Sequence, residues 1–204
     1  EVKVGIKRKG AKDLMSFTII RDKIPQESVD ASYMVNKEIG YIKVSRFAAS
    51  TYDEFRQALS ELKSQGMNRL ILDLQGNPGG YMDRAINMAD EFLRDDALIV
   101  YTEGKQPRYN SKANAYREGL FENQPIIVLI DEGSASASEI VAGALQDNDR
   151  ALIVGRRSFG KGLVQMPIPL DDGSELRLTI SRYYTPSGRS IQKPYEEGAK
   201  QYGQ

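Results

Sequence analysis

Apolar and polar residues alternate along several short stretches of the chain, and two of these stretches lie at its start. Residues 2–8 and 15–21 both alternate with a period of two, and Lys9-Gly10 between them favours a turn. The pattern predicts a hairpin over residues 1–22 and a linker over residues 23–30. Because two strands alone are marginally stable, we expect this hairpin to depend on further structure.

Beyond residue 30, stretches with strand patterning alternate with stretches of helical spacing. Strands are predicted at residues 31–36, 40–47, 69–74, 97–102, 126–130 and 151–154. Helices are predicted from the capping box Thr51-x-x-Glu54 to Gly66, over about 82–94, and over 136–147. Such repeated strand–helix units predict an α/β core with parallel strand pairing.

The last part of the chain shows strand patterning without intervening helices. Strands are predicted at 163–170, 174–181 and 183–185, with an Asp172-Gly173 turn between the first two. The polar stretch 103–124 is predicted to be irregular, and residues 194–204 are predicted to be a loose polar tail.

The amino-acid composition excludes several kinds of active site and ligand. The 204 residues hold 28 Lys plus Arg and 28 Asp plus Glu, so no excess of basic charge points to nucleic acid. The absence of His and Cys excludes Ser-His-Asp and Cys-His catalysis, thiolate zinc sites and disulfides. Nucleophilic chemistry must therefore use Ser, Thr or Lys, with Lys, Asp or Glu as the base. No run reaches the roughly 18 apolar residues that a membrane span needs.

A run rich in serine, Gly133–Glu139, lies between a predicted buried strand and a helix. A serine at such a junction lies at the carboxyl end of the strand, where α/β sheets place their sites. The free N–H groups of the helix N-terminus there suit an oxyanion on an attacked carbonyl. Ser136-x-x-Glu139 is also a capping box, and local sequence alone favours Ser136 as a simple helix cap.

Two glycine-rich segments offer further sites. Gly76–Gly80 follows a predicted strand, and its consecutive glycines suit either an anion-binding turn or simply a tight βα turn. Gly155–Lys161 formally matches the start of a phosphate-binding P-loop. However, Gly162 stands where a P-loop needs Ser or Thr, and Pro167 and Pro169 exclude the following helix, so this segment predicts a nucleotide site only weakly.

Lys161 has a second interpretation in a chain without histidine. A lysine held among glycines and apolar residues can lose its proton by desolvation and serve as a base. The alternative is a solvated lysine in a loop, which is the more common situation.

Four segments in this order resemble the C-terminal processing peptidases, tail-specific serine proteases with a Ser/Lys dyad. The segments are Leu72–Gly80, Gly133–Glu139, Ser158–Gln165 and Tyr183–Gln192. The resemblance covers residues 31–193 as a catalytic domain, with Gln75 where the family commonly has Arg. Residues 1–22 resemble the closing strands of the PDZ domain that accompanies the catalytic core in this family.

The resemblance implies a crotonase-like or ClpP-like α/β core and assigns roles to particular residues. Ser136 matches the nucleophile, Lys161 the general base, and Gln165 the residue that orients the lysine. The N–H groups of Ala137 and of the Gly79-Gly80 turn match the oxyanion hole. Since four residues of extended strand span about 13 Å, the chain must turn near Gly162, or Lys161 must fold back, for Gln165 to reach it.

The function implied is that of a serine endopeptidase that cleaves proteins or peptides near accessible C-termini through an acyl-enzyme. The resemblance implies no cofactor and no metal, a bacterial cell-envelope location, and compatibility with a homo-oligomer. The alternative is a non-catalytic or latent binding relative of the same fold. The presence of Ser136, Lys161 and Gln165 at all three matching positions argues against that alternative.

Overall fold

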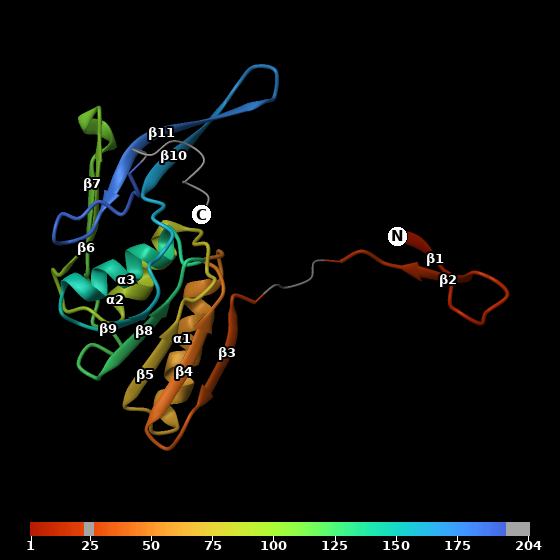
Figure 1. Ribbon diagram of the computed structural model, residues 1–204, viewed down its shortest axis with the longest axis horizontal. Helices are drawn as coiled ribbons and strands as arrows, with labels where there is room; N and C mark the ends of the chain where they lie inside the picture. Colours follow the sequence, from red (N-terminus) through yellow and green to blue (C-terminus); the bar gives the residue numbers. More distant parts are fainter. Residues whose placement is uncertain (23–26, 195–204) are drawn as a thin grey trace.

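The computed structural model describes residues 1–22 and 27–194, which form three β-sheets and three α-helices (Figure 1). The central sheet has the strand order β3-β4-β5-β8-β9, and its strands are β3 (Val29–Met34), β4 (Ile39–Val44), β5 (Arg69–Asp73), β8 (Ile126–Ile130) and β9 (Leu152–Gly155). The last four strands in this order pair in parallel, and β3 is antiparallel to β4. The predicted α/β core with parallel pairing is therefore confirmed, although β3 begins inside the segment predicted as a linker.

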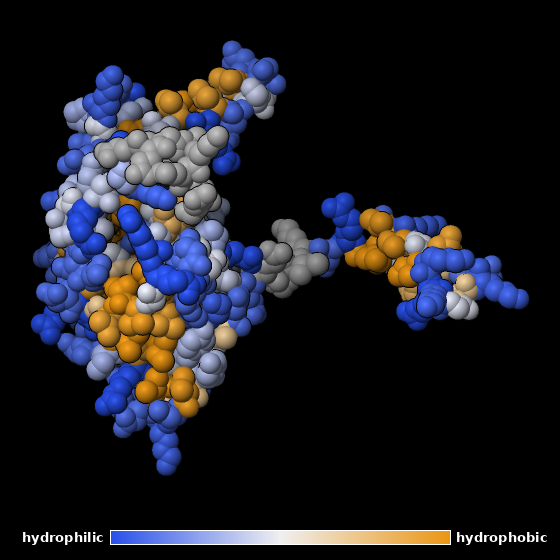
Figure 2. Space-filling view, in the orientation of Figure 1, coloured by the Kyte–Doolittle hydropathy of each residue, from blue (hydrophilic) through white to orange (hydrophobic). Residues whose placement is uncertain are grey.

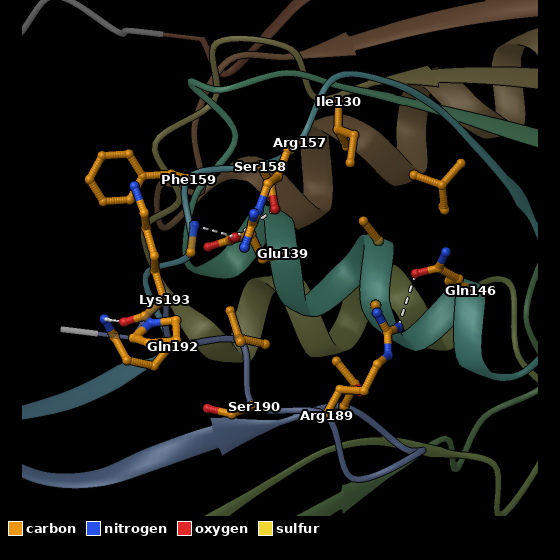
Figure 3. A pocket seen from close by; sticks show the side chains of 17 residues that line it. Ile130, Glu139, Gln146, Arg157, Ser158, Phe159, Arg189, Ser190, Gln192 and Lys193 are labelled. Atoms are coloured by element: carbon orange, nitrogen blue, oxygen red, sulfur yellow. Dashed lines mark hydrogen bonds between the residues drawn. The ribbon is translucent and has the colours of Figure 1, made fainter. Parts of the chain in front are cut away.

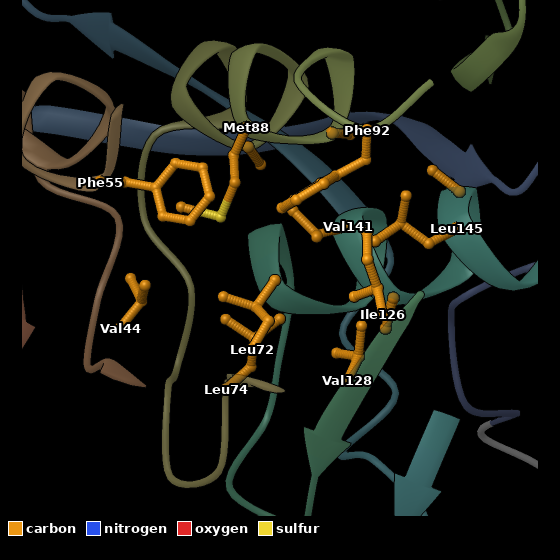
Figure 4. Close-up of a cluster of buried hydrophobic side chains, with 14 of the residues drawn as sticks. Val44, Phe55, Leu72, Leu74, Met88, Phe92, Ile126, Val128, Val141 and Leu145 are labelled. Carbon is orange, nitrogen blue, oxygen red and sulfur yellow. The ribbon is translucent and has the colours of Figure 1, made fainter. Parts of the chain in front are cut away.

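Three helices supply the apolar side chains that cover one face of this sheet. They are α1 (Thr51–Ser64), α2 (Met82–Asp90) and α3 (Ala137–Asp147). Figure 4 shows Phe55, Met88 and Val141 of these helices meeting Leu72 and Val128 of the sheet. All five side chains are fully buried, so the core lies between the helical layer and the sheet.

The start of α1 differs from the predicted capping box. Ser50 is the N-cap residue and Thr51 is already helical. The Glu54 carboxylate instead accepts hydrogen bonds from Ser28, from the N–H at 2.7 Å and from Oγ at 2.8 Å. The prediction was wrong because Glu54 fixes the chain entering β3 to α1, a tertiary contact that local spacing does not reveal.

Helix α2 ends four residues before its predicted end. The Glu91 carbonyl accepts the Phe121 N–H at 3.0 Å, and the Glu91 carboxylate accepts the Leu120 N–H at 2.8 Å and the Tyr52 hydroxyl at 2.6 Å. These contacts with distant segments end the helix, while Phe92 remains in the core.

The second sheet is antiparallel, with the order β10-β11-β6-β7. Its strands are β6 (Leu98–Gly104), β7 (Ser111–Asn114), β10 (Leu163–Pro169) and β11 (Glu175–Tyr184). Strand β7, and the 3₁₀ turn η1 (Pro107–Tyr109) before it, lie in the stretch predicted to be irregular. The sequence of β7, Ser-Lys-Ala-Asn, has little strand patterning, so its pairing with β6 decides its conformation. Strand β11 is continuous where two strands were predicted.

The predicted N-terminal hairpin is confirmed as strands β1 (Val2–Ile6) and β2 (Met15–Ile19). Cross-strand register places Val2 opposite Ile19 and Ile6 opposite Met15, so these apolar side chains share one face. Figure 2 shows that this face of the hairpin is exposed, as are apolar side chains on the β10–β11 ribbon. None of the helices in the described ranges combines the length and apolar character that crossing a membrane requires.

The central sheet allows a matched test of its core. Leu72 of β5 is fully buried, whereas Leu152 of β9 is 64% exposed on the face without helices. We expect Leu72→Ala to lower the free energy of unfolding by about 2–5 kcal/mol, because it opens a cavity among the helices. Leu152→Ala should change it by less than about 0.5 kcal/mol. Urea denaturation measures both, and equal losses would contradict this placement of the core.

Candidate active site

The predicted serine run and glycine turn lie at the same edge of the central sheet. Each follows the carboxyl end of one of two neighbouring parallel strands, β5 and β8. The Ser134 hydroxyl donates to the Leu74 carbonyl at 2.8 Å, and the Ala135 N–H donates to the Asn77 carbonyl at 3.0 Å. Parallel pairing thus joins two segments that are about sixty residues apart in the chain.

Gly79 is where the two turns approach most closely. A Cβ atom on Gly79 would lie 2.7 Å from the Ala135 oxygen, 2.8 Å from Ser136 Cβ and 2.9 Å from the Ala137 nitrogen. Its φ of +97° also lies in the region that favours glycine. Only glycine therefore lets the turn after β5 contact the backbone that carries Ser136.

Ser136 has a strained backbone at the start of α3. Its φ of +55° and ψ of −111° fall outside the regions that serine ordinarily occupies. Such conformations cost on the order of 1–3 kcal/mol and are concentrated at functional sites. A sharp strand-to-helix turn of this kind is also how α/β hydrolases expose a nucleophilic serine. Ser136 forms the predicted capping box with Glu139, so it occupies the N-cap position and an unusual conformation at once.

Backbone N–H groups near Ser136 are available to stabilise an anion. Within residues 27–194, neither the Ala137 N–H nor the Gly80 N–H is used in a hydrogen bond. The Gly79 N–H, also predicted as a donor, is occupied by Asn77 Oδ1 at 2.9 Å. The unused donors of the predicted oxyanion hole are therefore Ala137, at the N-terminus of α3, and Gly80.

The Glu139 carboxylate joins the serine run Gly133–Glu139, which we call the serine turn, to the segment that carries Lys161. Its Oε2 atom accepts the N–H groups of Ser136 at 2.8 Å and of Lys161 at 2.9 Å. Its Oε1 atom accepts the Ser158 hydroxyl and the Gly160 N–H, both at 2.7 Å. Glu139 is buried, and Figure 3 shows it directed from α3 towards Ser158. We call this carboxylate with its four donors the Glu139 clamp.

The clamp also decides against the nucleotide interpretation. The N–H groups of Gly160 and Lys161, which would have to face a phosphate, are occupied by a carboxylate. The segment continues into strand β10 and not into a helix.

Lys161 and Gln165 are the two predicted residues that the structure does not bring together. Both side chains are exposed, and no hydrogen bond between them is found in the described part of the chain. Of the two interpretations of Lys161, the exposed side chain agrees with that of a solvated lysine in a loop. Gln165 lies in β10 beside an irregularity in its pairing with β11, between Val164 and Gln165. The Lys161 N–H and the Ser136 N–H share Glu139 Oε2 as acceptor, whereas Gln165 lies farther along the chain in β10.

The two other serines of the run have structural roles. Ser134 and Ser138 are fully buried, and their hydroxyls donate to the carbonyls of Leu74 and Asn77 respectively. Asn77 itself is fully buried and also donates to the Val44 carbonyl at 2.9 Å. Sequence reasoning missed the role of Asn77 and treated Glu139 only as a capping residue. An asparagine within a glycine-rich turn and a glutamate within a buried helix were the available signals.

Asp131 is a second carboxylate that links the two turns. It accepts the N–H groups of Gly76 at 2.8 Å and Gly133 at 2.9 Å, and the Ser134 hydroxyl at 3.3 Å. Partial burial raises the pKa of the Asp131 carboxyl, but these hydrogen bonds outweigh burial and hold the pKa below its ordinary value. The charged form of Asp131 thus stabilises the folded arrangement of both turns.

A pocket with a volume of about 440 Å³ lies beside the clamp, between α3 and the segments around residues 157–160 and 189–194 (Figure 3). Glu139 contributes to its wall, whereas Ser136 and Lys161 are not among the described residues that line it. The described ranges contain no group of three or more acidic residues arranged to hold a metal ion.

The close contact at Gly79 predicts the effect of adding one methyl group. We expect Gly79→Ala to lower the free energy of unfolding by about 2–4 kcal/mol, since it combines a strained φ with overlap against Ser136. Gly76→Ala is the matched control, because it also has a positive φ, +70°, but has no atom within 4 Å of the added Cβ. That variant should lose only about 1 kcal/mol. Urea denaturation compares the two, and a Gly79→Ala loss as small as the control would refute the contact.

The lowered pKa of Asp131 predicts a pH dependence of stability. The folded state binds a proton at Asp131 more weakly than the unfolded state, so this stabilisation is complete above the unfolded pKa, about 3.8, and is lost as pH falls through the lower folded pKa. Asp131→Asn should therefore be about 1 kcal/mol less stable than the unchanged protein at pH 7, with the difference shrinking below about pH 4. Asp83→Asn, whose side chain is 64% exposed, is the control and should change the free energy of unfolding at pH 7 by less than about 0.5 kcal/mol. A constant difference across pH would contradict the assignment.

Carboxy-terminal processing proteases are among the known proteins that resemble this chain, and the resemblance extends over nearly all of it. A carboxy-terminal-processing protease of Bartonella bacilliformis is 44% identical over 191 residues, which cover 92% of this chain and 43% of the relative. The carboxy-terminal processing protease CtpB of Bacillus subtilis is 39% identical, with 94% of this chain and 40% of the relative covered. The chain thus spans less than half the length of these curated relatives.

The fold is also that of a known protease. The structure of a photosystem II D1 C-terminal processing protease matches with a TM-score of 0.70 and 32% identity, over 93% of this chain and 52% of that one. The family described as Peptidase family S41 matches residues 38–198, which include the serine turn, the glycine turn and the Lys161 segment. The chain therefore belongs to peptidase family S41.

Proposed function

We propose that this chain is the catalytic core of a serine endopeptidase in which Ser136 is the nucleophile and Lys161 the general base. The observation that carries the proposal is the strained backbone of Ser136 at the N-terminus of α3, beside two N–H groups that bind nothing in the described part of the chain. Nothing in helix capping requires this conformation, since ordinary N-cap residues lie in the β region. A nucleophile directed at a carbonyl does require a fixed approach to its oxyanion donors.

In the first step, neutral Lys161 Nζ accepts the proton of the Ser136 hydroxyl as Oγ attacks the carbonyl carbon of the scissile bond. The negative charge that develops on the carbonyl oxygen is stabilised by the N–H groups of Ala137 and Gly80. The positive end of the α3 dipole acts in the same direction. Because these donors are fixed by backbone packing, they need no reorganisation as the charge forms.

In the second step, the Lys161 ammonium donates its proton to the leaving amine, and the C–N bond breaks to give an acyl-enzyme. Water then attacks the ester, its proton passing to Lys161, and the released Ser136 oxygen recovers a proton from the lysine. One lysine thus serves first as base and then as acid in each half of the reaction. The scheme needs no metal and no cofactor.

Lys161 is exposed in this chain, so the proposal requires that bound substrate cover it. An extended substrate lying across the edge of the central sheet would exclude water from Ser136 and Lys161 together. The role of Gln165 in orienting the lysine is supported by its position in the family pattern, and it requires a rearrangement of both exposed side chains on binding.

The substrates, partners and location of the whole protein are proposed from its relatives. Relatives named for carboxy-terminal processing support cleavage of proteins or peptides near accessible C-termini. Residues 1–22 are proposed as the end of a PDZ domain, which the antiparallel pairing of β1 and β2 supports. A bacterial cell-envelope location and a homo-oligomer remain part of the proposal, and no partner role for nucleic acid is included. The non-catalytic alternative is not favoured, because Ser136, Lys161 and Gln165 all match the family pattern.

Cleavage of an unfolded protein substrate tests the proposed reaction. We expect activity that rises with pH, because only the neutral amine of Lys161 can accept the serine proton. Ser136→Ala and Lys161→Ala should each reduce kcat by at least about a thousandfold. Mass spectrometry of the products identifies the cleaved bonds and so also tests their position relative to the C-terminus.

Two substitutions of the same residue types serve as controls. Ser60 is exposed on α1 and Lys112 is exposed on β7, and neither lies near the proposed site. Ser60→Ala and Lys112→Ala should retain full activity. Activity that survives in Ser136→Ala would refute the assignment of the nucleophile, and activity that survives in Lys161→Ala would refute that of the base.

A further inference from the structure

We propose that Glu139 is a positioning residue that sets the separation of the nucleophile and the base, through hydrogen bonds to the backbones of both. This inference rests on the proposed Ser136/Lys161 reaction. It assigns to the buried carboxylate a role that helix capping does not include. Glu139 would not exchange protons with the substrate and would act only through the Ser136 turn and the Lys161 loop.

The hydrogen bonds of the clamp join two separate segments. One oxygen, Oε2, accepts both the Ser136 N–H and the Lys161 N–H, so the two backbones that carry the proposed dyad share a single acceptor atom. The other oxygen accepts Ser158 and Gly160, which fixes the loop immediately before Lys161. A further backbone contact, from the Phe159 N–H to the Ser134 carbonyl at 3.0 Å, supports the same loop.

An ordinary capping box explains only one of these four bonds. In that motif the glutamate returns to the N–H of the N-cap residue, here Ser136. The other three donors, Ser158, Gly160 and Lys161, lie outside α3 and follow β9. Hydrogen bonds to an ionised carboxylate are stronger than neutral ones, and the N-terminus of α3 favours negative charge at this position. The carboxylate therefore has the strength and the placement to fix the loop.

Because the Lys161 side chain is exposed, the hydrogen bonds of its backbone determine where the residue lies. Its Nζ atom makes no hydrogen bond to the described part of the chain, so no side-chain hydrogen bond fixes the position of Lys161. The position of its Cα relative to Ser136 is then set by the clamp and by Gly162, whose N–H donates to Gln192 Oε1 at 3.0 Å. Reaction rates fall steeply when catalytic groups are misplaced, by about a hundredfold for a displacement of about 1 Å.

Glu139→Gln removes the negative charge and one acceptor oxygen of the side chain while keeping its size. A glutamine has nearly the same shape but only one acceptor oxygen, and its NH₂ group would face two donors in place of the second oxygen. Either the Ser136 and Lys161 pair or the Ser158 and Gly160 pair must then lose its acceptor. The loop should move away from the serine turn although the core residues are unchanged.

Asp147 provides a matched control on the same helix. Its carboxyl is 5% exposed and accepts the Ser187 N–H at 3.0 Å, the Ser187 hydroxyl at 2.6 Å, and the Arg189 guanidinium. It lies at the opposite end of α3 from Ser136 and fixes a loop that carries none of the proposed catalytic groups. Asp147→Asn should therefore cost stability without altering the dyad.

The experiment measures cleavage kinetics and backbone amide hydrogen exchange in the unchanged chain, Glu139→Gln and Asp147→Asn. In Glu139→Gln we expect kcat to fall by at least about thirtyfold with KM changed less than about threefold, because the dyad and not substrate binding is disturbed. Exchange should accelerate at least about tenfold at the amides that lose their acceptor, either those of Ser136 and Lys161 or that of Gly160, whereas the Ser187 amide should not change. Asp147→Asn should show the opposite exchange pattern, with kcat within about twofold of the unchanged chain.

Two results would overturn the inference while leaving the proposed reaction intact. One is a kcat for Glu139→Gln that falls no further than that for Asp147→Asn, in a chain that Ser136→Ala inactivates. The other is unchanged amide exchange at all three of Ser136, Gly160 and Lys161 in Glu139→Gln, which would show that the carboxylate does not hold the two segments. If the unchanged chain and Ser136→Ala were equally inactive, the proposed reaction would be contradicted. Amide exchange would then still decide whether the clamp exists.

Discussion

A buried carboxylate requires hydrogen-bond donors for both of its oxygens, and Glu139 meets this requirement by holding the loop after β9 against the start of α3. Glu139 lies within the first turn of α3, where the serine turn supplies one donor and the loop after β9 supplies three. Without these donors the charge would be buried at a cost of several kcal/mol. The loop that carries Lys161 therefore has one favourable position against α3.

The strain at Ser136 depends on the same arrangement. A serine persists at φ +55° only where surrounding contacts over-determine it. Here the Ser136 N–H is bound by Glu139, and the missing side chain of Gly79 lets a second turn lie against Ser136 and Ala137. Asp131 adds hydrogen bonds between the two turns. The strained serine, the unused N–H groups and the lysine loop are thus consequences of one set of polar contacts.

Most helices and strands follow from local pattern, and the exceptions have tertiary causes. Apolar runs such as 69–74 and 126–130 predict β5 and β8 because buried parallel strands are continuously apolar. Strand β7 has no such pattern, since pairing with β6 determines it. Helix α1 has Ser50, not Thr51, as its N-cap because Glu54 binds Ser28, and α2 stops early because Glu91 binds Leu120 and Phe121.

For the site, composition and motifs limit the chemistry open to the protein and identify the candidate residues. Without His or Cys, a serine at a strand–helix junction needs a lysine or an acid as its base, and the resemblance to the C-terminal processing peptidases makes Ser136 and Lys161 the candidates. The fold determines that, within the described residues, the N–H groups of Gly80 and Ala137 are unused and that of Gly79 is not. It also leaves Lys161 and Gln165 exposed, and it lets Glu139 bind the backbones of both members of the proposed dyad. The reason is that the hydrogen-bond partners and the exposure of a residue depend on which distant segments lie against it. Parallel pairing of β5 with β8 and the burial of the Glu139 charge bring these segments together, and the local spacing of residues predicts neither of them.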